Sequence, residues 1–343
     1  DTITKPVIIR PMPVAAFTSN LGNYNCAPFT FQGFTAVNSY ANVDWFFTTS
    51  TGTPVGSTSG FNASYLAKKI NLKPTKKLGQ NFVIDQNTVE KIVKTAQIDK
   101  SSNVIEIGPG LGSLTLALLQ TGAKVTAIEI DEKLAKLLPQ TAKNKGLNEQ
   151  NLKVINKDAL KIKDSDVDSS VNVLVANLPY NVSVPVILHF LEVFPNINKY
   201  LVMVQSEVAD RLASPAGSKT YGAPSVKVQW YGQVKKSFAI SRNIFWPVPN
   251  VDSDLVEINR SKKIDETMRN NLFTLIDLAF EQRRKMLRSA LSSLFGGSEK
   301  ASLILQSAQI DPQLRGEALS VDDYVRLTNV MKKSGLLTNV TKS

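Results

Sequence analysis

The segment NVIEIGPGLGSLTLALLQ, residues 103–120, joins two apolar runs through a glycine-rich turn. The first run is typical of a buried strand, and the second is typical of a helix that packs on a sheet. Gly108, Gly110 and Gly112 permit a tight turn and let the backbone approach a ligand where a Cβ atom would collide. Taken alone, such a turn is as typical of a plain connection as of a nucleotide-binding loop.

An acidic residue near the end of the next predicted strand makes the nucleotide interpretation more specific. Glu129 lies 21 residues after Gly108, where a carboxylate can accept hydrogen bonds from both hydroxyls of a ribose. Ser113 stands where a dinucleotide loop has its third glycine, which argues against NAD. S-adenosylmethionine has the ribose but no pyrophosphate, so we expect it as the cofactor. Asp158, after a third predicted strand, is placed to bind the adenine amino group, and a turn or helix cap is the alternative.

Short β-rich runs alternate with amphipathic segments from residue 82 onward, which is the pattern of a doubly wound α/β sheet. Asp85, followed by apolar residues at helical spacing, predicts the cap of the first helix. Two late runs, 233–241 and 251–258, are expected to add antiparallel strands at the sheet edge. The other predicted strands are 103–108, 124–130, 152–156, 171–176 and 199–205.

The sequence turns helical after about residue 261, with residues 267–295 as the longest periodic piece. In a continuous helix, its apolar residues would share one side and group Arg284, Lys285 and Arg288 on another. We therefore predict an atypical segment at 1–64, an α/β domain at 65–261 and a small all-helical domain at 262–343.

The first 64 residues differ from the rest in composition. They contain two basic and two acidic residues, so the whole net charge of +11 lies in the remainder of the chain. They are rich in Thr, Ser, Asn and Gly, yet they also carry several aromatic residues, which disordered tails usually lack. We assign this segment no function.

Charge and residue usage narrow the function classes. A net charge of +11 favours a polyanion such as RNA, and a basic surface that serves only solubility is the equal alternative. Cys26 is the single cysteine and His189 the single histidine, which excludes intrachain disulfides, Cys/His zinc sites and Ser-His-Asp triads other than a His189 variant. His189 lies in an apolar helical run and is expected to be a packing residue. We expect no metal, no membrane span and a cytoplasmic protein.

The predicted strand at 171–176 ends in Asn177, Leu178, Pro179 and Tyr180, at the edge where open α/β sheets bind ligands. The lone pair of adenine N6 is delocalised into the ring, so this amine is a poor nucleophile. Acceptors on its two N–H groups, the Asn177 side-chain oxygen and the Leu178 carbonyl, would favour a tetrahedral nitrogen that attacks a methyl group. Pro179 holds Leu178 extended, and Tyr180 offers a face for base stacking, worth about 1–3 kcal/mol. A plain Pro turn with a packed Tyr is the alternative.

Motifs in a fixed order resemble the ribosomal RNA adenine N6-dimethyltransferases over about residues 66–331. This resemblance implies a Rossmann-like class I methyltransferase sheet with a small C-terminal helical domain, and residues 1–64 depart from the family pattern. The motifs are KKLGQNFVID (76–85), EIGPGLGSLT (106–115), AIEID (127–131), KDAL (157–160), NLPY (177–180), VQSEVADRLASPAGSKTYGAPSV (204–226), FWPVPNVDS (245–253) and AFEQRRKMLRSAL (279–291).

The resemblance also implies roles for individual residues. Phe245 is implied as a second aromatic ring that stacks on the target adenine opposite Tyr180, and a hydrophobic turn is the alternative. The basic residues Arg283, Arg284, Lys285 and Arg288 are expected to bind RNA. The residues expected at the cofactor are Gln80, Asn81, Phe82, Glu106, Gly108, Gly110, Gly112, Glu129, Asp158, Ala159 and Asn177.

By the same resemblance, the chain is expected to transfer four methyl groups from S-adenosylmethionine to two adjacent adenosines in a hairpin loop near the 3′ end of 16S rRNA. Its partner would be the small ribosomal subunit, and we expect a monomer. Three alternatives stay open: a small-subunit assembly factor with secondary or lost methylation, a large-subunit rRNA methylase of the antibiotic-resistance type, and a DNA adenine methylase. The segment AFEQRRKMLRSAL favours the small-subunit branch.

Overall fold

The computed structural model describes residues 45–48, 54–58, 74, 79–261 and 265–335, the first two ranges by their backbone alone. The chain divides into two compact units, Asp1–Ser59 and Gly60–Ser343. In the first unit, the described residues form an antiparallel hairpin of β1 (Trp45–Thr48) and β2 (Pro54–Thr58). The other residues of the predicted segment 1–64, Cys26 among them, lie outside the described ranges.

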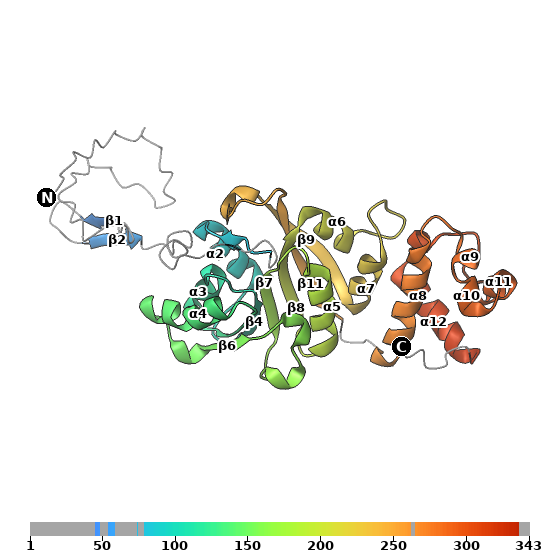
Figure 1. Cartoon of the computed structure of the whole chain (residues 1–343), viewed down its shortest axis with the longest axis horizontal. Helices are drawn as coiled ribbons and strands as arrows, with labels where there is room; N and C mark the ends of the chain where they lie inside the picture. Colours follow the sequence, from blue (N-terminus) through green and yellow to red (C-terminus); the bar gives the residue numbers. More distant parts are fainter. Residues whose placement is uncertain (1–44, 49–53, 59–73, 75–78, 262–264, 336–343) are drawn as a thin grey trace. The chain divides into compact units, whose positions relative to one another are not determined.

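A seven-stranded sheet of order β6-β5-β4-β7-β8-β11-β9 forms the centre of the second unit (Figure 1). The five strands from β4 to β8 are parallel, and β11 pairs antiparallel with both β8 and β9. The seven predicted strands are all present, with ends shifted by two residues at most. Their bounds are β4 (Asn103–Ile107), β5 (Lys124–Glu129), β6 (Leu152–Asn156), β7 (Val173–Asn177), β8 (Lys199–Gln205), β9 (Gly232–Ile240) and β11 (Ser253–Arg260).

Helices cover both faces of this sheet, as the doubly wound prediction requires. Alternate residues of a strand point to opposite faces, so Leu174 and Ala176 of β7 join one hydrophobic cluster and Val175 joins another. The first cluster includes residues of α5, α6 and α7, and the second includes residues of α2 and α3. The bounds are α2 (Gln86–Ala96), α3 (Ser113–Gln120), α4 (Glu132–Asn144), α5 (Ser183–Val193), α6 (Ser206–Ala213) and α7 (Ala223–Tyr231).

The strand order reverses beside β4, and this reversal decides where a ligand can bind. The chain runs outward from β4 through β5 to β6, and then returns to the other side of β4 with β7 and β8. The connections that leave β4 and β7 therefore diverge over opposite faces, which leaves a crevice at the carboxyl ends of these two strands.

A short second sheet connects the start of the α/β unit to its end. β3 (Phe82–Val83) pairs antiparallel with β10 (Phe245–Trp246), and Ile84 N donates to Ile244 O at 2.8 Å. β3 leads into α2, whose first turn is capped by the Asp85 carboxylate, which accepts from Thr88 N at 2.7 Å. The predicted Asp85 cap is thus confirmed.

The helical part is formed by α8 (Arg269–Glu281), α9 (Leu287–Ala290), α10 (Ser292–Phe295), α11 (Ser298–Ser307) and α12 (Val321–Lys333). The periodic piece at 267–295 is helical but is not one continuous helix, because α8 ends at Glu281 and the chain turns over residues 282–286. Leu287 N donates to Leu314 O at 2.7 Å, and Arg288 N donates to Pro312 O at 3.2 Å. These long-range hydrogen bonds replace helical ones and override the local periodicity.

The helical part packs on the α/β part without a break in the core. One hydrophobic cluster includes Trp230 and Tyr231 of α7 together with Leu272 and Ile276 of α8. At the edge of this contact, Lys227 of α7 forms an ion pair with Asp277 of α8 at 2.5 Å. The boundary predicted between residues 261 and 262 therefore stays a prediction, since both parts belong to one compact unit.

The α2 cap gives a test of the local structure. Replacing Asp85 with Ala should lower the free energy of unfolding by about 1 kcal/mol, because Thr88 N loses its acceptor at the helix start. Asp85→Ser, which keeps a capping oxygen, should lose less than half of that amount in urea unfolding. An equal loss in the two variants would show that capping is not what Asp85 contributes.

Candidate active site

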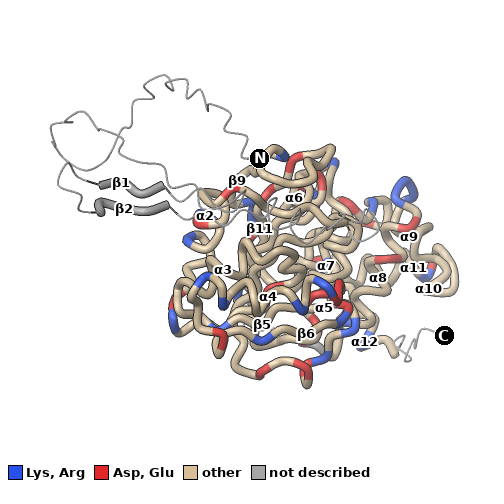
Figure 2. Tube along the Cα trace, turned by 60° about the vertical axis from the view of Figure 1, so that its left-hand side comes forward, with Lys and Arg blue, Asp and Glu red and all other residues tan. Residues whose placement is uncertain are grey.

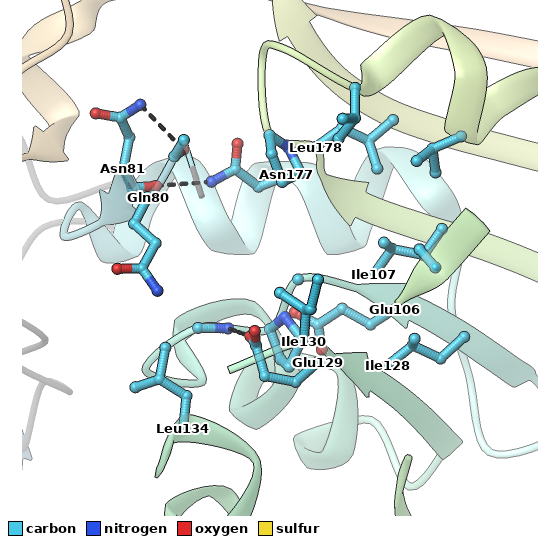
Figure 3. Close-up of a pocket in the computed structure, with 18 of the residues that line it drawn as sticks. Gln80, Asn81, Glu106, Ile107, Ile128, Glu129, Ile130, Leu134, Asn177 and Leu178 are labelled. Carbon is cyan, nitrogen blue, oxygen red and sulfur yellow. Dashed lines mark hydrogen bonds between the residues drawn. The ribbon is translucent and has the colours of Figure 1, made fainter. Parts of the chain in front are cut away.

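A cavity of about 260 Å³ lies at the carboxyl ends of the parallel strands (Figure 3). Its walls come from the ends of β4 and β7, the segments after β5 and β6, and the segment that contains β3. Every residue predicted to touch the cofactor lines this cavity except Gly112, and Asn177, Leu178, Pro179 and Tyr180 line it as well. The fold therefore brings together residues that are separated by up to 100 positions in the sequence.

Two glycines of the turn after β4 form part of the wall, and they differ in how strictly they are required. Gly110 has a φ of +58°, and a Cβ atom on it would lie 2.8 Å from Cδ1 of Phe82. Gly108 has a φ of +66°, but a Cβ atom there would meet only ordinary contacts with Asn177 and Pro179. Gly110 thus requires glycine both for its backbone conformation and for the close approach of Phe82.

Gly112 has a different role from the one predicted. It does not line the cavity, and it precedes the first residue of α3 with a φ of +92°. A Cβ atom at this position would lie 2.7 Å from Cδ1 of Leu138 in α4. Its lack of a side chain therefore lets α4 pack closely on the turn, and the predicted contact between Gly112 and the cofactor is not supported.

Glu129 combines burial with two backbone partners. Its Oε2 accepts from Gly110 N at 3.0 Å, and its Oε1 accepts from Asp131 N at 2.9 Å. Burial raises the pKa of the Glu129 carboxyl, and these two N–H groups partly oppose the rise. A carboxylate has about four acceptor positions, so each oxygen retains capacity for one hydroxyl of a ribose.

Glu106 of β4 is fully buried, and its Oε2 has no hydrogen-bond partner among the described residues. Burial raises the pKa of Glu106 to about 8, the nearby Thr115 hydroxyl lowers it in part, and the negative charge of Glu129 raises it further. An unpaired buried acceptor in a cavity wall is costly unless a ligand supplies a donor or a positive charge. S-adenosylmethionine carries an ammonium group and a sulfonium, so the acceptors of this wall fit it.

Asn177 is oriented by a hydrogen bond to the opposite wall. Its Nδ2 donates to the backbone oxygen of Asn81 at 3.0 Å, which leaves the side-chain oxygen as an acceptor (Figure 3). Next to it, Leu178 N donates to Met203 O of β8 at 3.1 Å and so extends the sheet by one residue. The two acceptors predicted for an amine, the Asn177 oxygen and the Leu178 carbonyl, therefore belong to a fixed turn.

The two predicted aromatic residues have different surroundings. Tyr180 lines the cavity, and its hydroxyl lies 2.7 Å from Oγ of Ser253. Phe245 is 1 % exposed, packs in the hydrophobic cluster of α2 and α3, and does not line the cavity. Side-chain alternation in β10 turns Phe245 into the core and places Trp246 on Phe82, with ring centroids 6.1 Å apart. The expectation that Phe245 stacks on the target base is not supported by this geometry, and the alternative of a hydrophobic packing residue fits it.

The remaining polar residues of the wall support its loops. Gln80 Nε2 donates to Oδ2 of Asp131, whose Oδ1 caps α4. Asp158 Oδ1 accepts from Leu160 N at 3.0 Å, so Asp158 caps the turn after β6 while it also lines the cavity. The two interpretations that the sequence left open for Asp158 are therefore compatible.

Among the apolar wall residues that the sequence analysis did not name, two are exposed. Ile130 is 52 % exposed, and Leu160 is also exposed, although both are large hydrophobic residues. Exposed apolar side chains in a cavity suit a flat ring such as adenine. The available signal was position, since Ile130 follows Glu129 directly and Leu160 lies two residues after Asp158.

The predicted RNA-binding residues lie outside the cavity, on the turn between α8 and α9 and at the start of α9 (Figure 2). Arg283 Nε donates to Glu317 Oε2 at 2.6 Å and its Nη2 donates to Lys219 O at 2.7 Å, so Arg283 braces the turn. Arg284, Lys285 and Arg288 are exposed and form no ion pair with the described residues. We call these three residues the cation patch.

The rest of the described chain shows few other candidates. His189 Nε2 lies 2.8 Å from Ile162 O, and its ring packs edge-on against Phe190, as expected for a packing residue.

Within the described ranges, no cluster of three His, Cys, Asp or Glu residues is arranged to bind a metal. None of the helices described is both long enough and apolar enough to cross a membrane.

The strand order, the antiparallel β11 and the acidic cavity beyond β4 and β5 define a class I methyltransferase fold. The chain belongs to the ribosomal RNA adenine dimethylase family, whose model matches residues 71–333. It is therefore an S-adenosylmethionine-dependent methyltransferase. The resemblance stated from the motifs is confirmed, and so are the predicted fold class and cofactor.

Individual relatives agree with this assignment. A ribosomal RNA small subunit methyltransferase A of Corynebacterium glutamicum is 53% identical over 272 residues, which cover 78% of this chain and 93% of that protein. The crystal structure of a dimethyladenosine transferase from Plasmodium falciparum matches 74% of this chain and 98% of its own length, with 26% identity and a TM-score of 0.64. The 23S rRNA methyltransferase ErmE, at 22% identity and a TM-score of 0.55, shares the fold.

Gly110 gives a direct test of the cavity wall. Gly110→Ala should weaken S-adenosylmethionine binding at least about tenfold, because the added Cβ displaces Phe82. Gly146→Ala is the matched control, since Gly146 also has a positive φ of +68° but nothing lies within 4 Å of its added Cβ. Calorimetric titration of both variants should show a loss only for Gly110→Ala. Equal affinities would place Gly110 outside the binding wall.

The raised pKa of Glu106 predicts how the stability of the cofactor-free protein depends on pH. Burial raises the pKa of its carboxyl from the ordinary value of 4.5 to about 8 in the folded state. Its stabilising contribution is therefore complete below pH 4.5 and is lost as the pH rises to about 8. Glu106→Gln should thus gain stability relative to the unmodified protein between pH 5 and 8. Thermal unfolding measures this difference, and the exposed Glu132→Gln should not show it.

Proposed function

We propose that this chain transfers methyl groups from S-adenosylmethionine to N6 of two adjacent adenosines in 16S rRNA, within the small ribosomal subunit. One observation carries the proposal: Asn177, Leu178, Pro179 and Tyr180 line the same cavity as the cofactor-type residues Glu106 and Glu129. The names of the relatives support the choice of small-subunit RNA, because relatives that are 50% to 53% identical are named small-subunit methyltransferases. Family membership supports an RNA substrate over DNA.

The residues of the turn prepare the amine. The Asn177 oxygen accepts one N–H of adenine N6 and the Leu178 carbonyl accepts the other, which draws the nitrogen toward a tetrahedral geometry and frees its lone pair. Asn81 fixes the direction of the Asn177 oxygen by accepting from Nδ2 at 3.0 Å. When bound, the cofactor supplies an electrophilic methyl group on a sulfonium. The chain thus contributes orientation and hydrogen bonding, and it concentrates these at one atom of the base.

Tyr180 supports the base from the side. Its ring lines the cavity and its hydroxyl is held by Ser253, so the ring is fixed before the substrate arrives. Stacking on one such ring is worth about 1–3 kcal/mol, which is comparable with the few kcal/mol needed to extrude a base. Phe245 is not assigned to this role, because its ring is buried in the core.

The cation patch is the part of the helical region that suits RNA. Three exposed cations without ion pairs among the described residues can neutralise phosphates, whereas the paired Arg283 holds the turn in place. The patch would serve methylation and a role as an assembly factor equally well. We infer a monomer that acts in the cytoplasm, where immature small subunits are found.

The central role of Asn177 can be tested directly. Asn177→Ala should lower the rate of methyl transfer to undermethylated small subunits by at least about a hundredfold, since one of the two acceptors is removed. Cofactor affinity should change much less. Asn196→Ala is the control, because Asn196 is an exposed asparagine whose amide also donates to a backbone oxygen, that of Ser169. Labelled product mapped as N6,N6-dimethyladenosine confirms the reaction, and undiminished transfer by Asn177→Ala would contradict this mechanism.

The cation patch predicts a salt effect. Changing Arg284, Lys285 and Arg288 together to Ala should weaken small-subunit binding and reduce the slope of log affinity against log salt by about one unit for each lost phosphate contact. A triple Ala variant of Lys133, Lys136 and Lys143, exposed on α4, matches the change in net charge. Equal slopes for the two variants would show that only net charge matters.

A further inference from the structure

Several exposed apolar side chains lie in the cavity wall or in segments attached to it. Of the eight exposed large hydrophobic residues in the described part of the chain, Ile130 and Leu160 line the cavity and Ile84 directly follows β3. Val248, 56 % exposed, and Val251, 41 % exposed, lie in one loop between β10 and β11. Single exposed hydrophobic residues need no explanation, but two on a six-residue loop beside a substrate cavity indicate a contact surface.

This loop, Pro247–Asp252, is attached to the cavity wall at both ends. The residue before it, Trp246, stacks on Phe82 with an interplanar angle of 22°, and Phe82 lines the cavity. The residue after it, Ser253, holds the hydroxyl of Tyr180, which also lines the cavity. Both ends of the loop that carries the two valines are therefore attached to side chains of the cavity wall, and one of these is the ring on which the target base is proposed to stack.

Hydrogen bonds from Arg242, which precedes β10, brace the loop, so its valines are held without a ligand. Arg242 Nη1 donates to Asn250 O at 2.7 Å, and Arg242 N donates to Asp252 Oδ1 at 3.0 Å. Pro247 and Pro249 further restrict the backbone because their rings fix φ. A preformed loop loses little conformational entropy when it contacts a partner, which favours its use in recognition.

The residue types of the loop indicate whether it contacts a base or a phosphate of an RNA substrate. Its one charged side chain is an anion, Asp252, which forms an ion pair with Arg242 at 3.4 Å. The loop itself therefore offers no cation to a phosphate. Two exposed valines instead fit the apolar face of a base. When a target adenine leaves its stack to enter the cavity, the neighbouring base loses a stacking partner, and apolar side chains can occupy the vacated position.

We propose that the loop Pro247–Asp252 is a wedge, in which Val248 and Val251 pack on the base next to the target adenosine and hold it out of the stack. This inference rests on the proposed function, because it requires an adenosine of RNA in the cavity. It adds a contact for the adjacent nucleotide that neither Asn177 nor Tyr180 makes. It also gives a reason why one site can methylate two adjacent adenosines, since the wedge contacts the base next to whichever adenosine occupies the cavity.

The test uses the variant Val248→Ser with Val251→Ser on the full chain, and Leu303→Ser as its control. Leu303 is the most exposed of the large hydrophobic residues described, and it lies on α11, away from the cavity walls. The wedge variant should lose about tenfold or more in kcat/KM for small subunits, equivalent to about 1.4 kcal/mol of lost packing. Its affinity for S-adenosylmethionine should be unchanged, and Val248→Leu with Val251→Leu should retain activity.

A modified substrate separates a wedge from a structural effect. In a hairpin RNA with an abasic site next to the target adenosine, the unmodified protein should lose about the same factor, and the wedge variant should lose nothing further. Independent, multiplicative losses would overturn the proposal, as would full activity of the wedge variant on intact RNA. If the unmodified protein methylates no small-subunit RNA, the proposed function itself has failed, which is a distinct result.

Discussion

One hydrogen bond sets the chemistry of this cavity: Asn177 Nδ2 donates to the backbone oxygen of Asn81 across 96 residues of sequence. An amide side chain has donors on one side and an acceptor on the other, so this bond determines where the acceptor faces. It also joins the end of β7 to the segment before β3. Gly79 belongs to the same contact, because a Cβ atom there would lie 3.3 Å from Cβ of Pro179. The orientation of the reactive turn therefore depends on a segment that is distant in sequence.

The sheet was predictable because its signals are local. Parallel strands buried on both faces are continuous apolar runs, and their order in the chain leaves few topologies once connections are short and right-handed. The break after Glu281 was not predictable, because residues 267–295 keep helical spacing. The acceptors that interrupt the helix are the backbone oxygens of Pro312 and Leu314, whose proximity no local pattern shows.

In the candidate site too, the residues marked by local sequence signals were predictable and those placed by long-range contacts were not. Glu129, Asp158 and Asn177 lie within two residues of the ends of predicted strands, so the rule that parallel strands end at one edge was enough to place them together. Gly112 was grouped with the other glycines of the turn and Phe245 came from the resemblance, and neither argument says which neighbour each residue packs against. In β10, the pairing with β3 sends Phe245 into the core and Trp246 to Phe82. Ile130 and Leu160 were missed because apolar residues beside strands are normally core.

The continuous core between α7 and α8 joins the α/β part, which contains the cavity, to the helical part, which carries the cation patch. The Lys227–Asp277 ion pair and the hydrogen bond from Arg269 Nε to the Tyr231 hydroxyl lie at this contact, at 2.5 and 2.9 Å. The side chains of Lys227 and Arg269 are mostly buried, which makes these pairs more specific than surface pairs. Arg283 then fixes the turn that carries the cation patch by binding both Glu317 and the Lys219 backbone. The patch is thus held at a defined distance from the cavity, so the phosphate binding proposed for it would restrict which nucleotide reaches Asn177.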